Sequence, residues 1–234
     1  MTTPRVSFIV PCLNEEANLE ATVQDIRAAA RDAALTFEIL VIDDASWDAT
    51  GRIADRLAAE DPHVLALHNA QRRGLGANYF IGVDKAQGEF VMMVPGDHEI
   101  PLPAIATVLA ELGKADMIIP YMTNLHTRPL ARRLISIAFT RFSNVLFGLS
   151  LKYYNGPCLL RTRLVQGVTL RSEGFAYAAA VLVLLQRAGA TYREVPISLL
   201  YRQHGRSNAV TWKNIRSIIQ VLWRLTREVY DKPR

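Results

Sequence analysis

The sequence predicts a single α/β domain in which a mainly parallel sheet is flanked by helices on both faces. Two observations predict this fold. Short apolar runs rich in β-branched residues alternate with segments of helical periodicity between Arg5 and Val94, and half of the 234 residues are hydrophobic. Alternating strands and helices of this kind form parallel strands joined by helical crossovers. A chain of this length can bury one large core, so we expect one domain.

The elements follow one another in a regular order. Arg5–Val10 is an almost wholly apolar run that stops at Pro11, which suits a strand buried on both faces. Apolar residues recur at helical spacing over Asn18–Arg31, which predicts the first helix. The same patterns predict further strands over Phe37–Ile42, Val64–His68 and Phe90–Val94, and further helices over Asp48–Ala59 and Gly76–Ala86.

Two later segments mix arginines with aliphatic and aromatic residues. His126–Tyr154 is too charged to span a bilayer comfortably and predicts one or two amphipathic helices, which either pack on the core or lie in a membrane interface. Trp212–Val229 predicts another such helix, and its tryptophans beside cations favour membrane contact. We therefore expect a main domain over residues 1–208 and a C-terminal amphipathic helix over residues 209–234.

Charge and cysteine content narrow the class of protein. A formal net charge of +5 predicts a surface that attracts phosphates, anionic lipid head groups or nucleic acid. The chain has no recognisable nucleic-acid-binding module, so we expect no nucleic-acid partner. Cys12 and Cys158 lack the spacing of a disulfide framework or a zinc site, which fits a reducing compartment. The N-terminus does not read as a signal peptide, so we expect a cytoplasmic protein, and its oligomeric state is not predicted.

Polar residues follow three of the predicted strands at the point where each strand ends. They lie in Pro11–Glu16, Asp43–Asp48 and Gly96–Glu99. In an open α/β sheet the ligand binds beyond the carboxyl ends of the strands, because the loops converge there. We therefore expect three acidic or amide-bearing clusters to meet at one edge of the sheet.

Four motifs occur in the order and spacing of a known family. They are VSFIVPCLNEEANL, EILVIDDASWDATGRIA, RRGLGANYFIGVDKAQGEF and GFAYAAAVLVLLQRAGATYREVPI. On these motifs, which cover roughly residues 5–208, the chain resembles the family-2 glycosyltransferases, and within them the polyprenol-phosphate (dolichol-phosphate) mannosyl- and glucosyltransferases. The resemblance implies a nucleotide-diphospho-sugar transferase fold of the GT-A, Rossmann-like type. It also implies inverting transfer of a sugar from a GDP- or UDP-sugar to a polyprenyl phosphate.

A metal site is the first feature that the resemblance places on particular residues. In VPGDHE, Asp97 stands where the family carries an acidic DxD motif that holds a metal against the donor diphosphate. Asp97 and Glu99 could both present oxygens to Mg²⁺ or Mn²⁺, and His98 would point elsewhere. Such a cation stabilises the charge that builds on the departing nucleoside diphosphate. Pro95 replaces the first acid of the motif, so one metal oxygen is lost.

The donor nucleotide is the second ligand that the resemblance implies. An aspartate at the end of the second strand would read the base or the ribose, since a carboxylate accepts two hydrogen bonds at once. Gly74 and Gly76 permit a close backbone approach before a helix N-terminus, where Arg72 or Arg73 could meet phosphate. Glu16, Ser46 and Asp48 could instead act as helix caps. The residues expected to contact the nucleotide are Pro11, Asn14, Glu15, Asp43 or Asp44, Arg73, Gly74, Gly96 and Asp97.

The acceptor and the diphosphate would need cations. The oxygen of a lipid phosphate is already anionic, so the reaction needs cations to position it rather than a strong general base. Arg128, Arg132 and Arg133 are expected to do this, although Arg132 and Arg133 cannot share one helix face. Asn155 and Gly156 would line the acceptor pocket. Arg202 and Arg206, on either side of a glycine, would close over the diphosphate as a lid.

Two other functions remain open from the sequence. The acceptor could be a saccharide or a lipid-linked saccharide in surface polysaccharide synthesis, which requires a general base. Glu173 is the nearby carboxylate for that role, because Ala180 stands where the family often has a glutamate. The chain could also be a donor-binding subunit without catalysis, since Pro95 replaces a motif acid. In either case we expect a nucleotide-sugar ligand and peripheral membrane contact at the cytoplasmic face.

Overall fold

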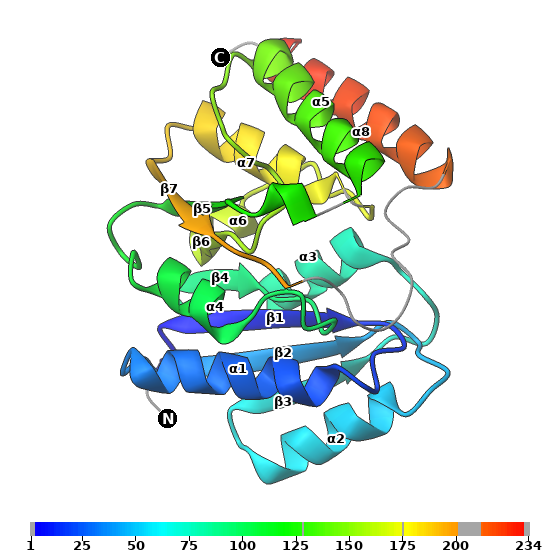
Figure 1. The fold of residues 1–234 in the computed structure, drawn as a ribbon, viewed down its shortest axis with the longest axis vertical. Helices are drawn as coiled ribbons and strands as arrows, with labels where there is room; N and C mark the ends of the chain where they lie inside the picture. Colours follow the sequence, from blue (N-terminus) through cyan, green and yellow to red (C-terminus); the bar gives the residue numbers. More distant parts are fainter. Residues whose placement is uncertain (1–2, 128, 175, 201–211, 232–234) are drawn as a thin grey trace.

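The computed structural model describes residues 3–127, 129–174, 176–200 and 212–231, and gives no side-chain description for residues 131 and 212–217. Its centre is a seven-stranded sheet in the order β3-β2-β1-β4-β6-β5-β7 (Figure 1). The strands are β1 Val6–Cys12, β2 Phe37–Asp43, β3 Val64–His68, β4 Phe90–Met93, β5 Met117–Met122, β6 Leu159–Arg161 and β7 Tyr192–Ile197.

Helices connect and cover these strands. They are α1 Leu19–Asp32, α2 Thr50–Glu60, α3 Leu75–Lys85, α4 Leu102–Leu109, the 3-10 turn η1 Leu125–Thr127, α5 Leu130–Phe147, α6 Thr162–Gln166, α7 Tyr177–Arg187 and α8 Trp212–Tyr230. Within the described residues, no helix combines the length and the apolar character needed to cross a bilayer.

The sheet is mainly parallel, as predicted, with one reversed strand. β1 pairs in parallel with β2 and β4, and β2 pairs in parallel with β3. β6 runs antiparallel to both of its neighbours, β4 and β5, while β5 and β7 are parallel. The first four strands therefore point their carboxyl ends the same way, which brings the loops after β1, β2 and β4 to one edge.

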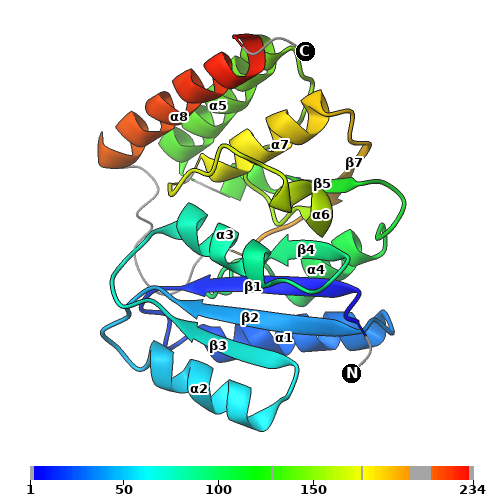
Figure 2. The ribbon, with the colours of Figure 1, turned by 180° about the vertical axis from the view of Figure 1, so that it is seen from behind.

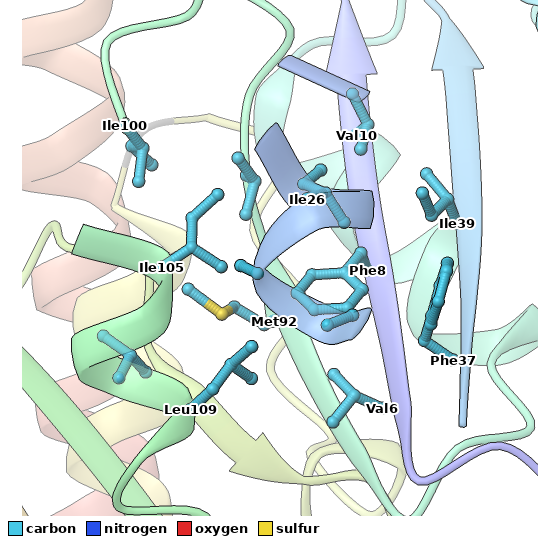
Figure 3. Packing of buried hydrophobic residues seen from close by; sticks show 14 of the residues in the cluster. Val6, Phe8, Val10, Ile26, Phe37, Ile39, Met92, Ile100, Ile105 and Leu109 are labelled. Atoms are coloured by element: carbon cyan, nitrogen blue, oxygen red, sulfur yellow. The ribbon is translucent and has the colours of Figure 1, made fainter. Parts of the chain in front are cut away.

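Two hydrophobic cores lie on the two faces of the sheet. Phe8 and Val10 of β1 face one core, together with apolar residues of α1, α2 and α4 (Figure 3). Ile9 faces the other core, which α3, α6 and α7 cover (Figure 2). All three residues are fully buried, and burial of side chains of this size contributes about 1.5–3 kcal/mol each. The prediction of strands buried on both faces is confirmed.

The outermost layer consists of α5 and α8, which lie beyond α7 in both ribbon views. Leu225 of α8 and Phe147 of α5 are fully buried in the second core. The predicted boundary after residue 208 lies outside the described residues, so it stays a prediction. Each of the two predicted amphipathic segments contains one long helix, α5 in the first and α8 in the second.

The end of the first strand was predicted wrongly. The sequence pattern stops it before Pro11, whereas β1 continues through Pro11 to Cys12 and stays paired with β2. Pro11 has no N–H to donate. Its carbonyl accepts a hydrogen bond from the amide of Gly96 on the β4 side, at 3.0 Å. The N–H that Pro11 lacks would therefore point toward β4, beyond Met93, where the pairing of β1 with β4 has already ended. The pairing of β1 with β2 is unaffected.

Candidate active site

The loops after β1, β2 and β4 each contain one left-handed residue that is not glycine. Asn14 after β1, Ala45 after β2 and His98 after β4 have φ angles of 56°, 60° and 54°. Such conformations are uncommon for residues with a Cβ and concentrate at functional sites. They turn the chain sharply as each strand ends, which brings the polar side chains of the three loops to one edge.

The loops after β1 and β2 are joined by hydrogen bonds. The amide of Asn14 donates to the Ser46 hydroxyl at 2.9 Å, and the amide of Trp47 donates to the Asn14 side-chain oxygen at 3.0 Å. The amide of Glu15 donates to the Thr50 hydroxyl at 2.7 Å. Glu15 itself is buried. The two loops therefore form one connected wall at the edge of the sheet.

Two acids of this wall cap α2. Glu16 accepts a hydrogen bond from the amide of Ala49 at 2.9 Å, and Asp48 accepts one from the amide of Thr50 at 2.9 Å. Both amides lie at the start of the helix, where backbone donors have no partner within the helix. The structure therefore assigns Glu16 and Asp48 a capping role, which was one of the two roles that the sequence predicted for them.

Asp43 ends β2 with both oxygens engaged. Its Oδ1 accepts the amide N–H of Ser46 at 3.1 Å, and its Oδ2 lies 3.3 Å from Nδ1 of His68. Cys12 of β1 lies opposite Asp43 in the parallel register, and its thiol is 3.4 Å from a backbone oxygen of β2. Burial, and then the charge of Asp43, raise the pKa of the Cys12 thiol, so it is a neutral thiol and not a nucleophile.

Asp44 holds the glycine loop that precedes α3. Its Oδ1 accepts hydrogen bonds from the Asn69 amide group at 2.9 Å and from the backbone N–H of Arg73 at 2.8 Å, and its Oδ2 accepts the N–H of Gly74 at 2.9 Å. The residue is only 3% exposed. Asp44 therefore fixes the loop after β3 to the end of β2.

Gly74, which precedes α3, and Gly76, in its first turn, approach another part of the backbone than expected. The sequence suggested that Gly74 and Gly76 make room for phosphate. A Cβ at Gly76 would lie 2.0 Å from the carbonyl oxygen of Ser172, and one at Gly74, whose φ is 94°, would lie 3.0 Å from that of Glu173. The amide of Gly76 donates to this Glu173 carbonyl at 2.9 Å. Both glycines thus permit contact with residues 172–174.

The acidic loop after β4 lies beside the end of β1. The 3.0 Å hydrogen bond from the Gly96 amide to the Pro11 carbonyl holds the start of this loop beside β1. Asp97 is partly exposed, and its carboxylate accepts the amide N–H of Glu99 at 3.3 Å. The His98 ring turns away toward α1, as expected, with its Nε2 3.1 Å from Asp25. Asp97 and Glu99 therefore lie on either side of a residue that is anchored elsewhere.

Sequence similarity decides the family. Residues 7–161 match the model of the family described as "Glycosyl transferase family 2". The chain belongs to this family. It is 31% identical over 220 residues to the undecaprenyl-phosphate mannosyltransferase of Micrococcus luteus, covering 87% of this chain and 86% of the relative. It is 29% identical over 227 residues to the polyprenol monophosphomannose synthase of Mycolicibacterium smegmatis, covering 92% and 84%.

Solved structures show the same fold. Glucosyl-3-phosphoglycerate synthase from Mycobacterium tuberculosis in complex with UDP aligns with a TM-score of 0.73 at 18% identity, over 95% of this chain and 80% of that one. Its complex with Mn²⁺, UDP-glucose and phosphoglyceric acid aligns with a TM-score of 0.71 at 17% identity, over 95% and 80%. The expected GT-A fold and glycosyltransferase class are confirmed for this family-2 enzyme.

The side-chain oxygen atoms of the acidic loop are suitable ligands for a hard divalent cation. Asp97 and Glu99 offer carboxylate oxygens, which Mg²⁺ prefers together with water and phosphate oxygens. No three His, Cys, Asp or Glu residues of the described chain lie together as a metal-holding group. The protein would thus supply two carboxylates, and the donor diphosphate and water would supply the other oxygens.

The residues predicted on the acceptor side are only partly described. Arg132 is partly buried and Arg133 is exposed on the first turn of α5. In Figures 1 and 2 the first turns of α5 and α8 lie toward the same side of the molecule as the carboxyl ends of β1 and β2. Asn155 is exposed, and Gly156 packs closely against Pro120 of β5. Arg128, Arg202 and Arg206 lie outside the described residues, so their roles stay predictions.

Sequence reasoning missed the end of β3. His68 and Asn69 follow one another there, and each holds one of the consecutive acids Asp43 and Asp44. The signal was available, because β3 is a predicted parallel strand and its carboxyl end must reach the same edge. Neither residue stands out locally, because His68 occupies the last position of the strand and Asn69 is a common loop residue.

Proposed function

We propose that this family-2 glycosyltransferase moves a hexosyl group from a nucleoside diphosphate sugar to a polyprenyl phosphate with inversion at the anomeric carbon. One observation supports it above others: the loops after β1 and β2 form a single hydrogen-bonded wall that includes Asp43 and Asp44, and the loop after β3 is bonded to Asp44. The names of the two similar mannosyltransferases support a polyprenyl phosphate acceptor.

The wall would bind the nucleoside. Oδ1 of Asp44 already accepts two hydrogen bonds. Oδ2 of Asp44 and both oxygens of Asp43 each have a second lone pair with which they can accept a hydrogen bond from a base or a ribose hydroxyl. Asn14 and Glu15 would form the opposite side of this subsite, with Pro11 and Gly96 beneath. Because the loops are bonded to each other before the donor arrives, little loop ordering is needed on binding.

Asp97 and Glu99 would hold Mg²⁺ or Mn²⁺ against the donor diphosphate. The cation, when bound, supplies positive charge where the leaving nucleoside diphosphate becomes more negative. His98 keeps its own ring out of this space through Asp25, and Asp25 also accepts the N–H of Leu102 at 2.9 Å, at the start of α4. A single residue of α1 thereby holds both the acidic loop and the start of α4.

The reaction would be a single displacement. An anionic oxygen of the lipid phosphate forms a bond to the anomeric carbon while the bond from that carbon to the β-phosphate oxygen breaks, and the nucleoside diphosphate departs with the electron pair. No proton has to be removed from the attacking oxygen. The roles left to the protein are orientation and charge, for which Arg132 and Arg133, with Arg128, are proposed on the acceptor side.

Membrane contact through α5 and α8 would bring the lipid to the site. Leu134, Phe142 and Val145 of α5 are 56%, 55% and 85% exposed, and Ile219 and Trp223 of α8 are each 61% exposed. Exposed apolar side chains that gather on helices beside cations suit a membrane interface. The protein would act at the cytoplasmic face of a membrane as a peripheral enzyme.

The test is transfer of radiolabelled sugar from GDP-mannose and UDP-glucose to undecaprenyl phosphate in detergent, with Mn²⁺ or EDTA. The wild type should make a lipid product from one donor only when the metal is present. Asp97→Asn should reduce the rate at least about a hundredfold, while Asp32→Asn, at the exposed end of α1, should leave it unchanged. Metal-dependent transfer to a saccharide but not to the lipid phosphate would instead favour the alternative in which Glu173 is the base.

A further inference from the structure

His68 stands at the carboxyl end of β3 with a carboxylate against each ring nitrogen. In the parallel register His68 is directly opposite Asp43 of β2. Its Nδ1 lies 3.3 Å from Asp43 Oδ2, and its Nε2 lies 2.9 Å from Asp55 Oδ1 of α2. One imidazole thus joins the end of β2 to the neighbouring helix at the nucleoside wall.

The start of α2 is shaped to accommodate this pair. A Cβ at Gly51 would lie 3.0 Å from Asp43 Oδ2 and 3.6 Å from the His68 ring. The first contact is tighter than ordinary packing, so any larger residue at Gly51 would push against the carboxylate. The Asp43 side chain is only 9% exposed, whereas the His68 side chain is 41% exposed and in reach of solvent protons.

From His68, hydrogen bonds lead to the two loops of the wall. Asp43 accepts the ring on Oδ2 and the amide of Ser46 on Oδ1, and the Ser46 hydroxyl accepts the amide of Asn14. The series therefore crosses from β3 to the loop after β2 and on to the loop after β1. The ring is thus connected through Asp43 to the loop after β2, and through Ser46 to the loop after β1.

The charge of the ring decides whether both of its contacts are hydrogen bonds. An imidazolium donates from both nitrogens, but a neutral imidazole has one N–H, so one carboxylate would then face a lone pair. Among the described residues, the charged groups that contact the ring are Asp55 from α2 and Asp43 from β2. The hydrogen bond with Asp55 first, and then that with Asp43, raise the pKa of His68 above its ordinary value of about 6.5, against the opposing effect of burial.

We propose that His68 is a positioning residue for the donor nucleoside. As an imidazolium it holds Asp43 and, through Ser46, the wall that the nucleoside contacts, so donor affinity falls as pH rises and the ring loses its proton. The inference rests on the proposed function, because it requires the nucleoside of the donor to bind at this wall.

The experiment is a calorimetric titration of the full chain with GDP-mannose and UDP-glucose, with Mn²⁺, between about pH 5.5 and pH 8.5. The diphosphate of a nucleotide sugar is a diester, so the probe itself does not titrate in this range. For the donor that binds, the wild-type Kd should rise about tenfold across the titration, which is about 1.4 kcal/mol. His68→Leu should bind with the weak affinity of the high-pH wild type at every pH.

Three further variants separate positioning from general damage to the fold. His68→Asn keeps a neutral donor near Asp43 and should restore tight binding without pH dependence. Asp55→Asn, on the exposed face of α2, should move the midpoint to lower pH. His63→Asn removes a histidine that also pairs with an aspartate, Asp61, but at the opposite end of β3, and should keep the wild-type profile.

Each outcome decides the proposal. A wild-type pH profile in His68→Leu and His68→Asn would overturn the positioning role while leaving the proposed function in place. Equal flattening in His63→Asn would also overturn it, because the effect would then not belong to the site. A wild-type protein that binds neither nucleotide sugar would overturn the proposed function, and this inference with it.

Discussion

Replacing Asp44 by asparagine isolates the carboxylate that holds the loop before α3. The carboxylate accepts three hydrogen bonds, two on Oδ1 from Asn69 and Arg73 and one on Oδ2 from Gly74. An amide oxygen can keep the first two bonds, but the amide nitrogen then faces the N–H of Gly74. The variant therefore loses one charged hydrogen bond completely and the charge of the other two.

The size of the effect follows from these bonds. A hydrogen bond to a charged group contributes about 1.5–3 kcal/mol, and charge roughly doubles the strength of a hydrogen bond. Removing a buried charge recovers part of its desolvation cost, which lowers the total. We expect Asp44→Asn to reduce the free energy of unfolding by about 2–3 kcal/mol, which a domain with a typical stability of about 5–15 kcal/mol survives.

Urea denaturation followed by circular dichroism measures this change. With an m-value of about 2–3 kcal/mol/M, the midpoint should fall by about 1 M without a change in m. Asp32→Asn, a change of the same chemistry on the exposed end of α1, should leave the midpoint unchanged. An unchanged midpoint in Asp44→Asn would refute the holding role, and if donor binding were nevertheless lost, Asp44 would act as a direct reader of the nucleoside.

Three other predictions test separate features of the molecule. Gly76→Ala places a Cβ 2.0 Å from a backbone oxygen and should cost about 2 kcal/mol or more of stability by urea denaturation, whereas Gly167→Ala, with its nearest contact at 3.4 Å, should cost less than about 1 kcal/mol. The Thr191 hydroxyl and amide, and then an arginine, lower the pKa of Asp116. The contribution of Asp116 to stability is therefore complete above about pH 4 and is lost as the pH falls through its lower folded-state pKa. Asp116→Asn should make the melting temperature fall less steeply as the pH is lowered below about 4. Trp223→Ser should weaken cosedimentation with anionic vesicles several-fold, whereas the control Gly167→Ala should bind as the wild type does. Equal vesicle binding by the two variants would show that α8 does not contact the membrane.

The first half of the fold could be predicted because its strands are buried on both faces. Phe8 and Ile9 point into different cores, so the whole of β1 is apolar and stands out from the polar loops around it. The predicted bounds of β3 agree with the structure, and α1 and α3 begin and end within a residue or two of the predicted positions. Hydrophobic pattern alone carries this information.

The second half could not be predicted in the same way. β6 is only three residues long, and its place between β4 and β5 depends on partners far along the chain. α7 is buried on nearly every side, and an apolar run such as Tyr177–Leu185 has no polar face from which its period could be read. Neither element has a local signal that separates it from its alternatives.

The candidate site shows the same division. The convergence of the loops after β1, β2 and β4 follows from parallel strands, so those residues could be named in advance. The contact of Gly74 and Gly76 with residues 172–174 could not, because glycine shows only that something approaches closely and not what. Long-range packing gave these glycines a structural partner where the sequence suggested a phosphate.

The reversed strand also affects how the protein is made. The first four strands can pair as the ribosome releases them, since each one joins an edge that already exists. β5 has no such edge, because both of its neighbours, β6 and β7, are synthesised after it. Between the release of residues 122 and 159 the nascent chain carries an apolar strand without a partner, and an unpaired strand of this kind promotes aggregation. A chaperone that binds nascent chains would have its greatest effect in that interval.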